Sequence, residues 1–314
     1  MDLTGDMKIH KIEFSQILDS ARMTEFWNRA FVSLLFTAVI LLVASSCKNE
    51  DQFLLPTPDP IIVEDQVLVP AGEVVLGNDP EGWGNYQLAV GLNPVYLDSF
   101  YIDRFEVSNQ QYADYLTTMW NAGLIYMTGP GDVYQDITNY LLIEITSEDC
   151  PIRYNSSVQG FEVEVGSEEL PVVMVTWYGA SFYAQYYAKR LPTESEWEKA
   201  ARGVVDVFGT VAGVGVGYPY PWGDAIPTES LANFGDIIGS PVDVDSYTAG
   251  MSWFGAFNMA GNVREWTATS IGGAKIHRGG SFLSSADLLK TAMRTFSDPQ
   301  TTDKTIGFRC VVDM

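Results

Sequence analysis

Residues 257–266, FNMAGNVREW, contain a set of groups that could bind a metal ion through oxygen. The set follows spacings of three, two and two along the chain and comprises Asn258, Gly261, Val263 and Glu265. An amide oxygen, two backbone carbonyls and a carboxylate presented by one tight Gly-Asn turn suit a hard cation such as Ca²⁺. The stretch offers neither sulfur nor imidazole, so zinc is a poor candidate. The pattern is therefore compatible with a calcium site.

The same stretch has a simpler interpretation. Gly261 and Asn262 can form a turn that requires only positive φ, a conformation that glycine and asparagine tolerate. Glu265 can then pair with a neighbouring arginine instead of a cation. Both interpretations stay open on this pattern alone.

Further motifs surround this stretch in a fixed order. They are RLPTESEWEKAARG at residues 190–203, YPWGD at 220–224, RGGSF at 278–282 and GFRCV at 307–311. An ordered set of this kind is far more specific than any one motif. Over roughly residues 67–313 the chain resembles the formylglycine-generating enzyme family, also called sulfatase-modifying factors. The resemblance implies an α+β fold, a loop-rich variant of the C-type lectin fold with little regular secondary structure.

The resemblance also implies a second oxygen cluster within residues 231–246, LANFGDIIGSPVDVDS. By analogy with the family's other calcium site, Asn233 and Asp236 would contribute side chains, and Phe234 and Ile238 would contribute carbonyl oxygens. The alternative is a solvated acidic loop. With the first set, this cluster predicts structural Ca²⁺ as the cofactor.

The catalytic cysteines of the family are replaced in this chain. The family's namesake uses two cysteines, five residues apart after a Gly-Gly-Ser motif, to bind copper and activate O₂. Those positions hold Ser284 and Leu289, neither of which supplies a thiolate for Cu(I). Arg264 stands where the family usually has Trp, and Thr305 where Asn is usual, while Ser281 is retained. The resemblance therefore predicts no copper site and no catalytic residues.

Iron and thiol chemistry are also poorly supported. The sulfoxide synthases of thiol-histidine biosynthesis, a second enzymatic branch, bind iron through three histidines. This chain has only His10 and His277, so we expect no iron, and we expect His277 to be a partly exposed strand residue. Cys150 and Cys310 could form a disulfide, although two separate buried thiols are favoured.

The charge balance bears on the choice of partner. Eighteen basic residues against forty acidic ones give a formal net charge of −22. A surface of this sign repels phosphate backbones, so nucleic acid is excluded as a partner. The same sign favours oxygen-ligated cations.

The N-terminal region resembles that of a bacterial lipoprotein. Residues 31–44, FVSLLFTAVILLVA, form an uncharged run that is short for a bilayer span and typical of a signal sequence. Residues 44–47, Ala-Ser-Ser-Cys, resemble a lipobox in which Cys47 becomes acylated. The alternatives are an ordinary cleaved signal peptide and an uncleaved anchor. We expect an outer-membrane lipoprotein of the cell envelope, held to the membrane by its lipid and facing either the periplasm or the surface.

The expected domain organisation follows from these segments. Residues 1–46 form an N-terminal extension and signal peptide, and residues 47–66 form a proline-rich tether. Residues 67–314 form the sulfatase-modifying-factor-like domain, with residues 121–170 as a β-rich insertion of two or three strands.

Hydrophobic periodicity and capping signals predict the elements of this domain. Two helices begin with capping boxes, one at Ser108 with Gln111 and one at Thr193 with Glu196. The expected helices are 108–120, 179–189 and 194–202. The expected strands are a hairpin over 67–77, one strand over 96–104 and a buried strand over 170–177, and 204–217 is a loop.

These observations favour a non-catalytic domain that binds or scaffolds a protein or glycan in the envelope. The alternative is an enzyme of the family, either an oxidase that generates formylglycine on a sulfatase or other protein, or an unrecognised activity that uses Ser281, Ser284 and Arg264.

Overall fold

The computed structural model describes residues 65–77, 95–128, 131–203, 215–216 and 218–314. The chain divides into two compact units, Met1–Thr57 and Pro58–Met314, and every described residue belongs to the second. The predicted signal sequence, Cys47 and nearly all of the tether lie outside the described residues, as does most of the predicted 204–217 loop. Within the described ranges, no helix has both the length and the apolar character needed to cross a membrane.

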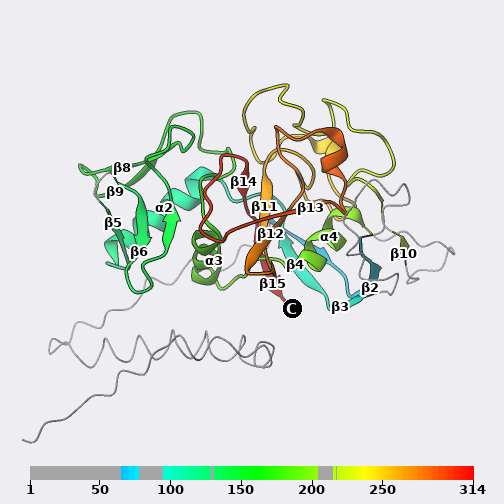
Figure 1. Cartoon of the computed structure of the whole chain (residues 1–314), viewed down its shortest axis with the longest axis horizontal. Helices are drawn as coiled ribbons and strands as arrows, with labels where there is room; N and C mark the ends of the chain where they lie inside the picture. Colours follow the sequence, from blue (N-terminus) through cyan, green and yellow to red (C-terminus); the bar gives the residue numbers. More distant parts are fainter. Residues whose placement is uncertain (1–64, 78–94, 129–130, 204–214, 217) are drawn as a thin grey trace, which may run out of the picture. The chain divides into compact units, whose positions relative to one another are not determined.

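The largest sheet of the domain has the strand order β13-β12-β11-β14. Its strands are β11 (Arg264–Ile271), β12 (Ala274–Arg278), β13 (Arg294–Ser297) and β14 (Ile306–Gly307). Strands β11, β12 and β13 are antiparallel, whereas β14 runs parallel to β11. Figure 1 shows this sheet between α4 on one side and the segment containing α2 and β5–β9 on the other.

Two three-stranded sheets replace the predicted hairpin. Strand β1 (Gln66–Val69) pairs with β4 (Phe100–Asp103), which also pairs with β15 (Val311–Asp313). Strand β2 (Gly72–Val75) instead lies between β3 (Val95–Leu97) and β10 (Gly215–Val216). The prediction of a hairpin over 67–77 is therefore wrong, because each strand finds its partner far away in sequence. The predicted strand over 96–104 is split between the two sheets for the same reason.

The β-rich insertion contains five strands rather than the expected two or three. Strands β5 (Ile125–Met127), β6 (Val133–Gln135) and β7 (Leu141–Ile143) form one sheet, and β8 (Ile152–Asn155) and β9 (Gly160–Val163) form a hairpin. Their buried side chains belong to the same apolar cluster as those of α2 (Asn109–Asn121) and α3 (Trp177–Tyr186). The insertion thus shares the main core of the domain, which also contains Trp266 of β11.

The capping signals are confirmed. Ser108 Oγ accepts from the Gln111 N–H, and Gln111 Oε1 accepts from the Ser108 N–H, so both halves of the capping box are present. The predicted stripe of α2 is buried, namely Tyr112, Tyr115, Leu116 and Met119. Helix α4 has the predicted bounds, Glu194–Arg202, with its capping box at Thr193 and Glu196 and its end at Gly203.

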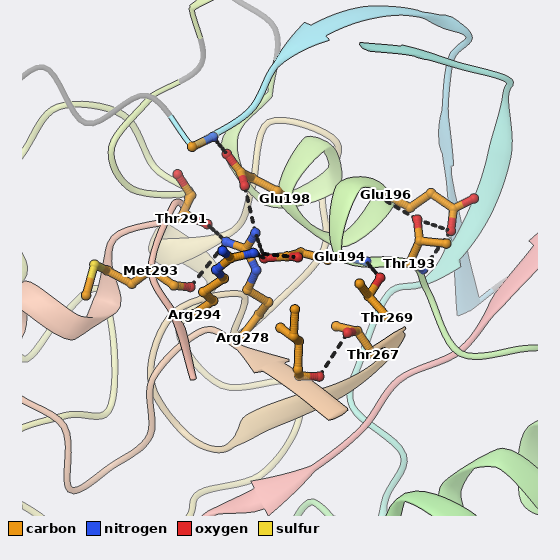
Figure 2. A network of polar contacts seen from close by, with 12 residues as sticks. Thr193, Glu194, Glu196, Glu198, Thr267, Thr269, Arg278, Thr291, Met293 and Arg294 are labelled. Carbon is orange, nitrogen blue, oxygen red and sulfur yellow. Dashed lines mark hydrogen bonds and ion pairs between the residues drawn. The ribbon is translucent and has the colours of Figure 1, made fainter. Parts of the chain in front are cut away.

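Helix α4 is attached to the central sheet through a buried ion network. Trp197 is fully buried, and Glu194 and Glu198 accept from the Arg278 guanidinium of β12 at 2.6 and 2.8 Å. Figure 2 shows Arg278 between these carboxylates, with Arg294 beside Glu194. The second nitrogen of Arg278 donates to the carbonyls of Thr291 and Met293. These contacts fix the end of β12, immediately before the Gly-Gly-Ser motif.

Two further expectations are corrected. Residues 170–177 are buried but do not form a regular strand, because Met174 adopts a positive φ of 58° that breaks the extended backbone. His277 is buried rather than partly exposed, and its ring nitrogens lie against the hydroxyls of Ser297 and Thr295. Burial, reinforced by the Arg264 charge, lowers the pKa of His277 to about 3, so the ring is neutral at pH 7.

The preference for two separate thiols is confirmed. Cys150 and Cys310 are both free and buried. Burial raises the pKa of Cys150 to about 11 and that of Cys310 well above its ordinary value. Thiols held in the neutral form in this way are unreactive.

Candidate functional site

A surface cleft of about 550 Å³ lies beside the start of β11. One wall is the loop after the Gly-Gly pair, which contributes Ser281 and Ser284. The segment 302–305 contributes Asp303 and Thr305 to the lining. Arg264, the first residue of β11, also lines the cleft. The structure therefore brings together the three residues that the alternative enzyme hypothesis singled out.

None of the described residues that line the cleft carries a thiol. Ser284, at the first of the two cysteine positions, lines the cleft, but Leu289 at the second is fully buried in an apolar cluster with Tyr220 and Ala260. The lining does include Met174, whose sulfur is a thioether rather than a thiol. Over the described residues there is also no group of three or more histidines, cysteines and carboxylates that could hold a metal ion.

The two serines of the cleft interact with each other. Their Oγ atoms lie 3.3 Å apart, and the Ser281 N–H donates to Ser284 Oγ at 2.9 Å. Among the described lining residues there is no histidine to activate either hydroxyl, and His277 is engaged elsewhere. The pair can therefore donate and accept hydrogen bonds, but it lacks the adjacent base that a serine nucleophile requires.

Arg264 interacts with the neighbouring 302–305 segment through its backbone and its side chain. Its Nη2 donates to Thr305 Oγ1 and lies 3.3 Å from Asp303 Oδ2. Asp303 is oriented by the Thr305 N–H and hydroxyl, which donate to its other oxygen. Burial lowers the pKa of Arg264, and the opposing effect of Asp303 does not fully offset it. The guanidinium stays charged at pH 7 but is only partly neutralised by its surroundings.

The two predicted cation loops meet beneath the cleft. The Asn262 N–H donates to the carbonyl of Asn233, and the Phe282 N–H donates to the carbonyl of Asn262. The loop after Asn233 also donates to the cleft wall, through Gly235 N–H to the Ser284 carbonyl and Asp236 N–H to the Phe282 carbonyl. These backbone contacts support the Ser281–Ser284 turn from below.

The first predicted set is engaged by protein groups. Glu265 forms a fully buried bidentate pair with Arg309, both bonds being 2.7 Å long, and accepts a third bond from Trp197 Nε1. This is the arginine pairing that the alternative interpretation described. The Asn258 amide nitrogen donates to Glu106 and to the Val244 carbonyl. Gly261 and Asn262 have positive φ values of 82° and 57°, and the Val263 side chain is buried.

The second predicted set contains one group that fits a cation well. Asn233 is buried, its amide nitrogen donates to the Ser240 carbonyl, and its Oδ1 has no partner among the described residues. A buried carbonyl oxygen without a donor is costly, and a hard cation would satisfy it. Asp236 and Ile238 are exposed, and Phe234 is half-buried. Calcium at either loop stays a prediction.

The sequence analysis missed Glu106. This carboxylate is buried and accepts hydrogen bonds from Asn258 and Asn262, next to the Arg309–Glu265 pair. Burial raises its pKa to about 8, although Arg309 acts in the opposite direction. No pattern could have identified it, because its partners lie about 150 residues away in sequence.

Comparison with known proteins identifies the family. The sulfatase-modifying factor enzyme 1-like domain matches residues 52–314, and the chain belongs to this family. The solved structure of CarF superimposes with a TM-score of 0.54 at 22% identity and covers 83% of this chain and 100% of CarF. The predicted fold class, a loop-rich α+β formylglycine-generating-enzyme-like fold, is confirmed.

Named relatives differ in the activity that their names state. A serine/threonine-protein kinase pkn1 of Chlamydia pneumoniae is 32% identical over 91% of this chain, but the match spans only 43% of the kinase. A formylglycine-generating enzyme of Streptomyces coelicolor is 27% identical and covers 82% of this chain and 92% of the enzyme. An inactive Cα-formylglycine-generating enzyme 2 of Mus musculus is also 27% identical and covers 91% and 96%. Membership of the family therefore does not establish catalysis.

The close approach of the two loops predicts a sharp difference between two glycine substitutions. A Cβ at Gly261 would lie 2.3 Å from the Asn233 carbonyl oxygen, whereas a Cβ at Gly272, which also has positive φ, would meet nothing within 4 Å. We expect Gly272→Ala to cost about 1–2 kcal/mol from the backbone conformation alone. Gly261→Ala should cost a further ~1–3 kcal/mol because the loops must separate.

Urea unfolding of the two variants beside the wild type measures this difference. Equal losses of unfolding free energy would show that Asn233 and Gly261 are not packed against each other as the structure has them.

Proposed function

We propose that this domain is a non-catalytic module that binds or scaffolds a protein or glycan partner in the bacterial envelope. The observation that carries the proposal is the composition of the cleft, where Ser284 replaces one cysteine and Leu289 is buried away from the lining. Formylglycine formation by copper and O₂ needs soft thiolate ligands, and the two thiols of the described domain are buried and neutral. The cleft retains hydroxyl, guanidinium and carboxylate groups suited to binding.

The competing function is that of the family oxidase. Its support is the likeness to a formylglycine-generating enzyme over most of both chains. We expect no stoichiometric Cu(I) binding by the purified protein and no oxygen consumption with a cysteine-containing sulfatase peptide. A cysteine-bearing formylglycine-generating enzyme assayed in parallel is the positive control. Copper-dependent oxygen uptake by this chain would overturn the non-catalytic assignment.

We further propose that the loops beneath the cleft bind structural Ca²⁺. The support is the orphaned, buried Oδ1 of Asn233 beside the exposed Asp236. Glu265 and Asn258 are also proposed ligands. To bind the ion, Glu265 would have to replace its contacts with Arg309, and Asn258 would have to replace its contact with Glu106. The ion would tie together the backbone segments that support the Ser281–Ser284 turn.

Calcium should raise the unfolding temperature, because a ligand that binds only the native state stabilises it by mass action. At about 100 times the dissociation constant the increment is ~2.7 kcal/mol. Asn233→Ala should abolish most of the increment, whereas Asn155→Ala, a change at a half-buried asparagine on β8 outside both loops, should preserve it. Identical melting curves in calcium and in EDTA would refute calcium binding.

The envelope location is proposed from the sequence of the N-terminal region. The support is the apolar run 31–44 followed by the lipobox-like residues that end in Cys47. Acylation of Cys47 would hold the domain to the membrane through the proline-rich tether. Expressed in a bacterial host, the wild type should sediment with membranes and Cys47→Ser should be released; a variant that still sediments would refute the lipid anchor.

A further inference from the structure

Arg264 lies farther from its carboxylate partner than Arg278, Arg294 and Arg309 lie from theirs. Arg309 has two carboxylate oxygens of Glu265 at 2.7 Å. Arg278 and Arg294 have carboxylate oxygens within 3.1 Å. Arg264 has its single carboxylate, Asp303, at 3.3 Å, and the Asp303 side chain is 37% exposed. Its partner is therefore both more distant and more strongly screened by solvent.

The guanidinium of Arg264 also has unused donors. Among the described residues only Nη2 has hydrogen-bond partners, while Nη1 has none and Nε is buried without one. The side chain is 22% exposed and lines the cleft. A planar guanidinium with free donors at an open cleft is suited to a second, planar anionic acceptor.

The serine pair supplies a further hydrogen-bond donor to the same cleft. Ser281 and Ser284 carry two hydroxyl protons, and their mutual hydrogen bond uses one of them. The other hydroxyl proton has no partner among the described residues. Arg264 and the serine pair line the same cleft, so both can contact one ligand.

The rim of the cleft is apolar on the serine side. Leu283 and Leu288 both line the cleft and are 43% and 39% exposed. Lys304 and Asp149 also line it and are paired at 3.7 Å. The cleft thus offers a guanidinium with an unused donor, a hydroxyl donor and an adjacent apolar surface.

We propose that this cleft binds a carboxylate carried on an apolar group, with Arg264 and the serine pair donating to the carboxylate and Leu283 and Leu288 contacting the apolar part. The ligand is the C-terminal residue of a polypeptide or a free acid of the same chemistry. The inference rests on the proposed binding function and names the ligand class for it.

The charges in the cleft select a carboxylate over a phosphate. Asp149 and Asp303 line the same cleft, and the chain carries a net charge of −22, so a dianion would meet strong repulsion. A monoanionic carboxylate meets less repulsion and matches the planar guanidinium. The exposed leucines favour an apolar substituent over a sugar, because sugar hydroxyls need polar partners.

Binding to the wild-type protein provides the first test and needs no variant. The probes are N-acetyl-leucine and the tripeptide N-acetyl-glycyl-alanyl-leucine, each compared with its C-terminal amide by calorimetry or chemical-shift titration. We expect each acid to bind about tenfold or more tightly than its amide, because the amide loses the charge-assisted hydrogen bond to Arg264. Tighter binding of the tripeptide acid would identify a polypeptide C-terminus, and equal binding of the two acids would identify a free acid.

Two variants of Arg264 and one matched control test whether Arg264 causes the preference for the acid over the amide. Arg264→Met removes the charge and should abolish the preference for the acid, whereas Arg264→Lys keeps the charge but loses the planar fork and should retain only part of it. Arg190→Met is the control, because Arg190 is a half-buried, ion-paired arginine that does not line the cleft. Circular dichroism and unfolding curves verify that each variant is folded.

Three results would overturn the inference. They are equal affinity for acid and amide, no detectable binding of either acid, and a preference that persists in folded Arg264→Met. Equal affinity would leave the proposed binding function standing, since the cleft would still bind the peptide. The non-catalytic assignment is tested separately. It would fail if the protein showed copper-dependent oxygen uptake, whether or not it prefers the acid to the amide.

Discussion

The buried ion pair between Arg309 and Glu265 is the interaction on which the rest of this domain depends. Both side chains are completely buried, and a buried charge that lost its partner would be left unsolvated. The Arg309 guanidinium also donates to the carbonyls of Asp103, Arg104 and Phe257. Glu265 in turn accepts from Trp197 of α4. One pair therefore connects the C-terminal segment, the end of β4, the loop before β11 and the helix.

The position of the cleft follows from this arrangement. Glu265 is the second residue of β11, so its pairing with Arg309 fixes the backbone of Arg264, which precedes it and lines the cleft. A second buried network acts on the next strand, where Arg278 is bound by Glu194 and Glu198 just before the Gly-Gly-Ser loop (Figure 2). Both the Gly-Gly-Ser loop and the start of β11 are thus held by arginines whose carboxylate partners lie within 2.8 Å, whereas the carboxylate partner of Arg264 lies at 3.3 Å.

Sequence patterns predicted those parts of the structure that depend on neighbouring residues. The capping boxes at Ser108 and Thr193 operate over three residues, and both helices begin where these signals place them. Pairings between distant segments could not be predicted in this way. The predicted hairpin over 67–77 does not form because β1 pairs with β4 and β2 with β3 and β10, and residues 170–177 do not form a strand because of the positive φ of Met174. His277 is buried by packing that no local pattern encodes.

The candidate site was predictable in part. The order of the motifs identified Ser281, Ser284 and Arg264, and the structure brings these residues to one cleft. The motif order could not show that Leu289 is directed into an apolar cluster, or that Arg264 and Asp303, 39 residues apart, leave guanidinium donors unused. Glu265 illustrates the same limit, since its spacing allowed both a cation and an arginine, and its contact with Arg309 depends on the packing of the whole domain.

A double-mutant cycle on Arg309→Met and Glu265→Gln, measured by urea unfolding, tests the central role of this pair most directly. Each single variant should lose about 3–5 kcal/mol of unfolding free energy, because it leaves one buried charge without its partner. The double variant should lose clearly less than the sum, with a coupling of at least ~1 kcal/mol. Additive losses would contradict the account, because they would mean that the two side chains do not stabilise the domain as a pair.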